Sequence, residues 1–258
     1  MHQIVIGNKT YEAPSQWSDC TPKQMRKAIA IVYDFECMRE VQLLDLFRLF
    51  VPISNTTFKQ LSEDTLFELC DCFKFVLDTF PEQVFFKEIN GNYLPHPRME
   101  FSSIAEFAIA EQYFEAFKTL KDKQYLYLLL ATLCRPLRAK KLIDSSGDIR
   151  IPCDTQKITA NAERMAKMKD TTALLVLHYY LGCRQYIFET YSKVYDSSES
   201  ATDENFVRIP YDMWDMIRDA AKTGLYGNYE NTLHTNLHLI LSNLNKERII
   251  AIAQGKNK

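Results

Sequence analysis

Two histidines, His234 and His238, lie four residues apart in a stretch with helical periodicity. That spacing places two imidazoles one helical turn apart, where they can chelate zinc. No glutamate follows the first histidine, and the sequence offers no third ligand nearby. Histidines are common on helix surfaces, so the pattern favours an ordinary helix face. The sequence therefore predicts no metal site and no cofactor.

Two cysteines, Cys70 and Cys72, also have close spacing, but within an expected helix they point to nearly opposite sides and cannot share a metal ion. Cys70 belongs to the apolar stripe of that helix, which predicts a core position. The chain has seven cysteines, an odd number scattered mostly among apolar neighbours. This usage is typical of reduced cysteines in a cytosolic compartment.

Signatures of nucleotide binding and of nucleophilic catalysis are missing from the sequence. None of the seven glycines forms a glycine-rich loop between a strand and a helix, and there is no Gly-x-Ser-x-Gly motif. His178 and Cys183 are five residues apart on an expected long helix, so they do not stack on one face. Both are better interpreted as core residues, and the sequence predicts no catalytic residue.

Paired carboxylates occur at helical spacing in two places, and both have basic residues interleaved. One pair is Glu111 and Glu115, and the other set is Asp212, Asp215 and Asp219. Each lies opposite an apolar stripe, which is the usual arrangement of a solvated helix face. Acid–base catalysis needs carboxylates in divergent environments, which a sequence alone does not show.

A basic cluster follows the most apolar run of the chain, Tyr125–Cys134. Pro136 disfavours helical geometry at the residue before it, so the helix is expected to end there. The cluster then lies at a helix C-terminus, where the peptide dipoles favour positive charge. It fits a solvated last turn, or a surface that grips an acidic partner or a phosphate. The candidate partner-contact residues are Arg135, Arg138, Lys140 and Lys141.

Composition and charge limit the possible partners. The 258 residues are 47% hydrophobic and 25% charged, with a net charge of −2, which is ordinary for a soluble globular protein. There is no global basic field to attract nucleic acid or an anionic membrane. The apolar run has about ten residues, whereas a membrane span needs about 20. We expect a buried helix there, no membrane partner and no direct nucleic-acid partner.

Turn and cap signals then place the elements. Gly7-Asn8 is a two-residue turn pair between Ile4-Val5-Ile6 and Lys9-Thr10-Tyr11, and Asn90-Gly91 separates two apolar runs. Both predict hairpins. Thr21-Pro22-Lys23-Gln24 carries the cap, the proline and the glutamine of a helix start. Short strands are expected at 148–154 and 206–210. Helical stripes predict helices near 21–32, 43–50, 62–80, 103–120, 125–134, 155–169, 171–195, 211–222 and 231–253.

These elements predict a mainly α fold, a multi-helix domain with a few short antiparallel β-hairpins. The main seam falls at the second hairpin. It divides the chain into residues 1–84, with the first hairpin and several helices, and residues 85–258, a helical domain with short strands. The two parts can pack as one unit.

Three segments in order resemble a known family. They are "FSSIAEFAIAEQYFEAF" with "YLLLATLCRPL", then "DIRIPCDTQKITANAERMAKMKDTTALLVLHYYLGCRQY", then "AAKTGLYGNYENTLHTNLHLILSNLNKE". Together they resemble helical proteins encoded beside tail genes in tailed bacteriophages, described as tail-assembly chaperones or baseplate-related proteins. The resemblance covers about Phe101–Glu247, and a Leu-rich helix ending in Arg-Pro (Leu128–Pro136) is its clearest part. Cys134 departs from it, since an aromatic residue is expected there.

The resemblance implies a non-enzymatic structural or assembly protein of a tail, baseplate or connector. Its expected partners are other phage structural proteins and copies of itself, in the host cytoplasm or in the virion. The acidic segment Asp196–Glu204 is a further expected exposed loop at the contact surface. Two alternatives stay open. One is an enzyme with a dispersed site around Glu106, Glu111 and His178, and the other is a host-directed regulatory binding protein.

Overall fold

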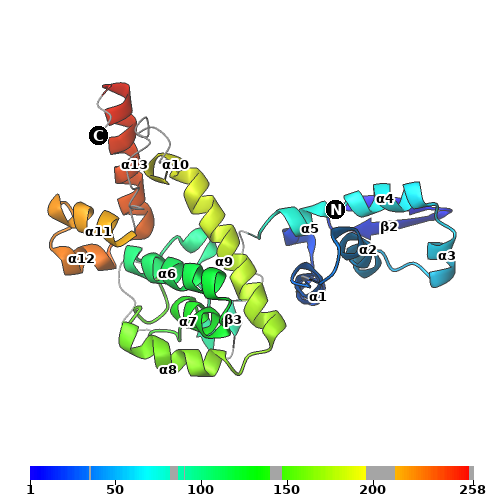
Figure 1. Ribbon diagram of the computed structural model, residues 1–258, viewed down its shortest axis with the longest axis horizontal. Coiled ribbons are helices and arrows are strands. Elements are labelled where there is room, and N and C mark those ends of the chain that lie inside the picture. Colours follow the sequence, from blue (N-terminus) through cyan, green and yellow to red (C-terminus); the bar gives the residue numbers. More distant parts are fainter. Residues whose placement is uncertain (35, 82–86, 90, 140–146, 196–212, 256–258) are drawn as a thin grey trace. The chain divides into compact units, whose positions relative to one another are not determined.

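The computed structural model describes all of the chain except residues 35, 82–86, 90, 140–146, 196–212 and 256–258. In the described part it has thirteen α-helices and two small two-stranded antiparallel sheets, so the predicted mainly α fold with short hairpins is confirmed (Figure 1). The chain forms two compact units. The first contains Met1–Phe86 and Met168–Gly182, and the second contains Lys87–Lys167 and Cys183–Lys258.

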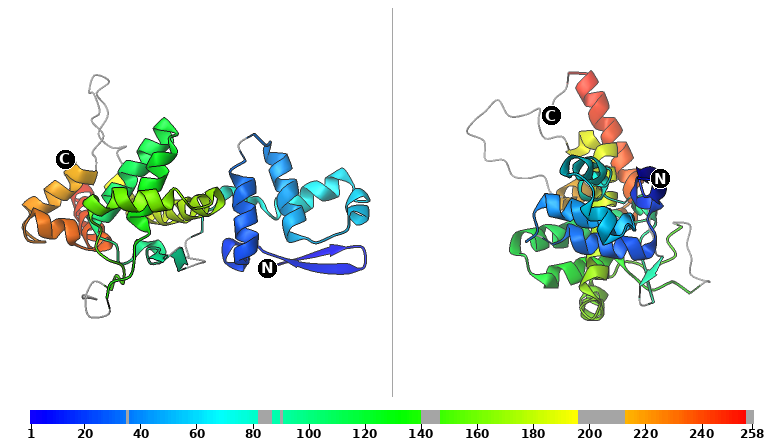
Figure 2. Two further views of the ribbon diagram at one scale, coloured as in Figure 1. Left: turned by 90° about the horizontal axis from the view of Figure 1, so that it is seen from below. Right: turned by 90° about the vertical axis from the view of Figure 1, so that its right-hand side faces the viewer.

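The first unit opens with the predicted N-terminal hairpin, a two-stranded ribbon (Figure 2). β1 (His2–Ile6) pairs antiparallel with β2 (Lys9–Ala13), and Ile6 lies opposite Lys9 across the two-residue turn. Gly7 has a φ of +59°, as the first central residue of this kind of turn requires. Alternation along β1 buries Ile4 and Ile6 and exposes Val5.

Five α-helices follow in this unit. α1 (Pro22–Val32) begins at the predicted capping box: the Thr21 hydroxyl accepts from the Gln24 amide, and the Gln24 side chain accepts from the Thr21 amide. A short 3₁₀ turn, Trp17–Asp19, precedes it. The other helices are α2 (Arg39–Phe50), α3 (Asn55–Lys59), α4 (Glu63–Asp71) and α5 (Lys74–Asp78).

The single helix predicted from Ser62 to Phe80 is wrong, because it breaks between α4 and α5. Phe73 leaves helical geometry there, with φ −106° and ψ 6°. Its ring is fully buried and packs against Phe47 and Phe50 at centroid distances of 6.3 and 5.3 Å. Burial of this ring in the core outweighs continuation of the helix.

The second unit begins with the other predicted hairpin, which is short. β3 (Glu88–Ile89) pairs with β4 (Asn92–Tyr93), and Gly91 has a φ of +77°. After a 3₁₀ turn at Pro97–Met99, three α-helices pack in succession: α6 (Ile104–Leu120), α7 (Lys123–Leu133) and α8 (Thr155–Met165) (Figure 1). α7 is the most apolar run of the chain. In the described residues, no helix is long and apolar enough to cross a membrane.

The long helix α9 (Asp170–Thr190) belongs to the first unit up to Gly182 and to the second from Cys183. The remaining helices are α10 (Ser192–Tyr195), α11 (Met213–Lys222), α12 (Tyr229–His234) and α13 (Leu237–Ala253). The predicted single helix from Asn231 to Ala253 is wrong. It breaks at Thr235, where the backbone turns aside to accept a hydrogen bond from the amide of Ile104, at the start of α6.

The expected strand at 148–154 is reduced to an isolated bridge between Leu137 and Arg150. The Arg150 amide donates to the side chain of Asp148, and Pro152 has no amide hydrogen to donate, so a ladder cannot continue. The expected strand at 206–210 and the acidic loop Asp196–Glu204 lie outside the described residues.

Candidate partner-contact site

The site is built where α7 ends. The helix stops at Cys134, which has extended geometry, and Arg135 continues as extended backbone before Pro136. Arg135 pairs with Tyr93 of β4 through two backbone hydrogen bonds of 2.8 and 3.1 Å. The chain leaving α7 is thus fixed to the hairpin, and the Arg135 side chain turns into the interior.

Four charged side chains form what we name the ionic cluster: Glu106, Arg135, Asp148 and Arg150. Glu106 lies on the first turn of α6 and contacts both arginines, at 2.5 Å from Arg135 and 2.9 Å from Arg150. Asp148 also contacts both, at 3.4 and 2.8 Å. All four side chains are at most 10% exposed, and two positive charges balance two negative ones.

The arginines also bind backbone groups. Arg150 Nη1 donates to the carbonyl of Leu133 at 2.7 Å, and Arg135 Nη1 donates to the carbonyl of Ile151 at 2.7 Å. The last carbonyls of a helix have no partner within the helix, so the first bond satisfies an end of α7. The cluster therefore joins α6, the end of α7 and the segment before α8.

The electrostatics of the ionic cluster favour the charged forms of Asp148 and Arg150. Burial alone would raise the pKa of Asp148, but hydrogen bonding and attraction from Arg150, aided by Arg135, lower it below its usual value. For Arg150, burial acts to lower the pKa, and the charges of Glu106 and Asp148 outweigh it and raise the pKa. Burial raises the pKa of the neighbouring Cys134 thiol to about 12, so this thiol stays protonated. The ion pairs of Asp148 and Arg150 therefore stabilise the charged form of both groups.

Outside the ionic cluster, residues 136–138 and 149–151 run antiparallel, and we name this pairing the backbone ladder. Arg138 donates its amide to the carbonyl of Ile149 at 2.8 Å, and Ile151 donates to the carbonyl of Pro136 at 2.9 Å. Two of its side chains, Leu137 and Ile149, are exposed at 43% and 47%. The backbone ladder thus exposes apolar side chains, and the buried ionic cluster fixes the backbone that carries them.

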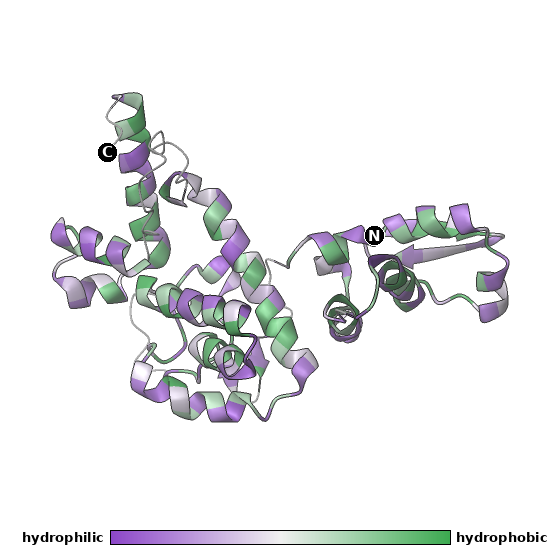
Figure 3. Cartoon of the chain, in the orientation of Figure 1, coloured by the Kyte–Doolittle hydropathy of each residue, from purple (hydrophilic) through white to green (hydrophobic). Residues whose placement is uncertain are grey.

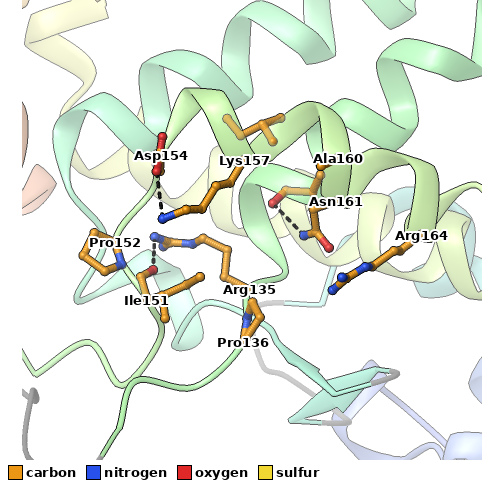
Figure 4. A pocket seen from close by; sticks show the side chains of 11 residues that line it. Arg135, Pro136, Ile151, Pro152, Asp154, Lys157, Ala160, Asn161 and Arg164 are labelled. Carbon is orange, nitrogen blue, oxygen red and sulfur yellow. Dashed lines mark hydrogen bonds and ion pairs between the residues drawn. The ribbon is translucent and has the colours of Figure 1, made fainter.

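A hollow of about 200 Å³ lies between the backbone ladder and α8 (Figure 4). Arg135, Pro136 and Ile151 line one side. α8 supplies the other side, and the amide of Asn161 binds the carbonyls of Cys134 and Ala131 at 3.0 and 3.4 Å. The full lining is Ala131, Arg135, Pro136, Ile151, Pro152, Asp154, Lys157, Ile158, Ala160, Asn161 and Arg164.

The candidate partner-contact residues have different environments in the structure. Arg135 is 5% exposed and belongs to the ionic cluster, so its expected place on an exposed surface is corrected. The reason is Glu106, whose buried carboxylate requires a cation. Arg138 is half-buried on the backbone ladder, where Nε donates to the carbonyl of Arg150. Lys140 and Lys141 lie outside the described residues.

The two histidines of the expected helical pair do not share a helix, since α12 ends at His234 and α13 begins after Asn236. His234 contacts Glu230, while His238 contacts Tyr191 at 3.0 Å and the carbonyl of Arg98 at 2.9 Å. Burial lowers the pKa of His238. Among the described residues, no group of three or more His, Cys, Asp or Glu side chains is placed to hold a metal ion.

The residues of the alternative enzyme site fall in both units. Glu106 and Glu111 belong to the second unit and His178 to the first. Glu111 is not on a simple solvated face, because Arg184 binds it at 2.8 Å and packs over the rings of Phe114 and Phe188. The pairs Asp215–Arg218 and Asp219–Lys222 lie on the exposed side of α11, and Asp212 is outside the described residues.

Asp148 and Arg150 are the members of the site that sequence reasoning missed. One signal could have indicated a buried ion pair. Glu106 lies four residues before Ala110, on the apolar stripe of the expected helix, and a carboxylate on a buried face needs a cationic partner. Comparisons of the chain with protein-family models, with curated proteins and with solved structures found no match.

Proposed function

We propose that this chain acts by binding other proteins, as a structural or assembly protein of a bacteriophage tail, baseplate or connector. The phage context rests on the sequence resemblance over Phe101–Glu247. The binding function rests on one observation above all: the backbone ladder exposes Leu137 and Ile149 beside Arg138, on a base fixed by the ionic cluster. The expected partners are other phage structural proteins and further copies of this chain.

This surface has the composition of a contact site. Interfaces combine apolar side chains with arginine at their centre, and arginine is frequent among the residues that dominate binding energy. A fixed backbone lowers the entropy cost of binding, because the contact residues are already ordered. The ionic cluster supplies that order, and the two lysines at 140 and 141 extend the basic character of the segment.

The last turns of α13 offer a second apolar surface. Figure 3 shows hydrophobic and hydrophilic residues alternating there, and Ile249, Ile250 and Ile252 are 48%, 54% and 42% exposed. Exposed apolar groups of this kind are typical of protein contact sites. An assembly protein that joins two neighbours, or a neighbour and its own copy, needs two such surfaces.

Quantitative mass spectrometry of gradient-purified particles of the encoding phage tests the proposal. A fixed ratio to the major capsid protein identifies a structural component. Abundance in the infected lysate with absence from particles identifies an assembly factor. If the chain is not encoded by a phage, or if it binds only proteins of an uninfected host lysate, the tail-assembly function is overturned.

A second experiment tests the contact surface itself. The variants Arg138→Glu and Ile149→Asp should each reduce co-purification of phage partners, and Arg138→Glu should act most strongly at low salt, because its charge is screened at high salt. Lys169→Glu, an equal charge change at another exposed position, is the matched control. Unfolding curves must first show that each variant remains folded. Unchanged partner binding in both variants overturns this assignment of the surface.

A further inference from the structure

The hollow beside α8 has an apolar interior. Its walls include Pro136 and Ile151 from the backbone ladder side, and Ile158 and Ala160 from α8. The two buried polar side chains of the lining are partly engaged: Asn161 donates to two backbone carbonyls, and the Nη atoms of Arg135 bind Glu106 and the carbonyl of Ile151. Asn161 Oδ1 and Arg135 Nε have no hydrogen-bond partner among the described residues, and the other inner wall groups are apolar. The binding free energy of an occupant therefore comes mainly from burial of apolar surface.

The size of the hollow limits the occupant. Pockets for cofactors and other small-molecule ligands usually have about 300–1,000 Å³. At about 200 Å³, this hollow is too small for a nucleotide or a similar cofactor. It is large enough for one aliphatic side chain, which is how an extended or helical protein segment anchors itself in a partner.

The charge at the rim selects among such segments. Lys157, Asn161 and Arg164 are spaced by four and three residues, so they lie on one face of α8. Lys157 forms an ion pair with Asp154 at 3.0 Å. Arg164 is exposed, and within the described residues no ion pair neutralises it. In Figure 4 the Lys157 and Arg164 side chains both extend from α8 around the hollow.

We infer that this hollow receives a leucine-sized side chain from an acidic segment of a partner protein, with a carboxylate beside that side chain meeting Arg164, while Lys157 keeps its ion pair with Asp154. The inference rests on the proposed binding function and specifies the chemistry of the partner. Apolar burial supplies affinity, and the positive charge of Arg164 orients the segment and disfavours basic ones.

Fluorescence anisotropy of the full chain tests it with three labelled synthetic peptides of equal length. The first has a central leucine flanked by aspartates, the second has serine in place of the leucine, and the third has lysines in place of the aspartates. We expect saturable binding of the first alone. The affinity should weaken by about tenfold in Arg164→Glu, because an attraction becomes a repulsion.

Ala160→Phe tests the hollow directly. Ala160 is exposed and lines the hollow, so a phenyl ring there fills it without entering the core. Binding of the leucine peptide should be lost. Lys167→Glu makes the same charge change on an exposed side chain that does not line the hollow, and it should weaken binding far less than Arg164→Glu. Unfolding curves show whether each variant is folded.

The outcomes separate this inference from the proposed function. If the leucine peptide binds Ala160→Phe as tightly as it binds the parent chain, the hollow is not its binding site. If no peptide binds, the inferred role of the hollow is overturned while the proposed binding function stands. The same conclusion follows if phage partners bind Ala160→Phe normally but do not bind Arg138→Glu. Equal binding of the leucine and serine peptides reduces the site to nonspecific charge attraction and also overturns it.

Discussion

The Nη2 atom of Arg135 lies 2.5 Å from Oε2 of Glu106, and the two side chains are only 6% and 1% exposed. This contact crosses from the end of α7 to the first turn of α6. The same carboxylate lies 2.9 Å from Arg150, so one buried anion holds two cations. The segment that carries the proposed contact surface is attached to the helices through this group.

Replacing Glu106 by glutamine should therefore be strongly destabilising. The variant keeps the shape of the side chain but leaves two buried arginines with Asp148 as their remaining anion. Breaking a buried ion pair in this way costs about 3 kcal/mol or more in the free energy of unfolding. Urea unfolding followed by circular dichroism measures the loss, and hydrogen exchange should locate it in α6 and α7. Glu115→Gln, which removes an exposed ion pair with Lys118 and a longer one of 3.6 Å with Arg184, should cost about 0.5 kcal/mol or less. Equal losses in the two variants would show that the ionic cluster does not stabilise the fold.

Asp148 gives the second unit a defined acid sensitivity. Its pKa in the folded chain lies below its usual 3.8, because Arg150 and Arg135 outweigh the effect of burial. Below that usual value the unfolded chain binds a proton that the folded chain does not, so stability falls as the pH is lowered from about 4. In Asp148→Asn this loss should be smaller over the same interval, although the variant is less stable at neutral pH. Urea unfolding between pH 5 and 2.5 measures the free energy of unfolding of both proteins. An equal fall with pH in the two proteins would show that Asp148 does not cause the acid sensitivity.

Local elements could largely be predicted from the sequence, because their signals are contained in neighbouring residues. The Gly7-Asn8 turn, the Thr21 capping box and the end of α7 before Pro136 all follow from short-range backbone chemistry. Each needs information from only about four residues. The breaks at Phe73 and Thr235 could not be predicted in this way. In both cases a contact with a distant segment decides the geometry: Phe47 and Phe50 for one, the amide of Ile104 for the other.

The candidate site shows the same division. The basic turn after α7 is visible in the sequence, but the sequence does not show that Arg135 faces inward and Arg138 does not. That distinction depends on Glu106 and Asp148, which are 29 and 13 residues away from Arg135. Likewise the hollow exists because α8 packs against the end of α7, with Asn161 binding the Cys134 carbonyl. No local pattern contains a contact between 134 and 161.

His178 should make the first unit sensitive to mild acid. The centroid of its ring lies 4.9 Å from the ring centroids of both Trp17 and Phe80. Burial lowers the pKa of His178 from 6.5 to about 3. Between these values the unfolded chain binds a proton that the folded chain does not, so stability falls as the pH drops below 6.5. The loss is about 2 kcal/mol at pH 5. His178→Phe should remove most of this slope, since a phenyl ring carries no proton.

Trp17 reports this change without interference from the second unit. The chain has two tryptophans, so a Trp214→Phe background leaves Trp17 alone. Its fluorescence during urea unfolding at pH 7, 6 and 5 gives the slope for each variant. His234→Gln, at an exposed position on α12, controls for the loss of a histidine in itself. A slope in His178→Phe equal to that of the parent would place the titrating group elsewhere.

Gly182→Ala provides a test in which two physical effects have opposite signs. Alanine is a better helix former than glycine by about 1 kcal/mol, so propensity alone predicts a more stable α9. A Cβ atom at position 182, however, would overlap the carbonyl oxygen of Pro81 and lie 3.2 Å from Cβ of Phe80. The first contact is with backbone, which cannot rotate away as a flexible side chain can. Overlap in a packed interior costs about 1–3 kcal/mol or more, so we expect net destabilisation of the first unit. Unfolding followed by Trp17 fluorescence in the Trp214→Phe background measures the sign. A gain of about 1 kcal/mol instead would mean that propensity prevails and that the segment at Pro81 does not pack on α9 as closely as the structure shows.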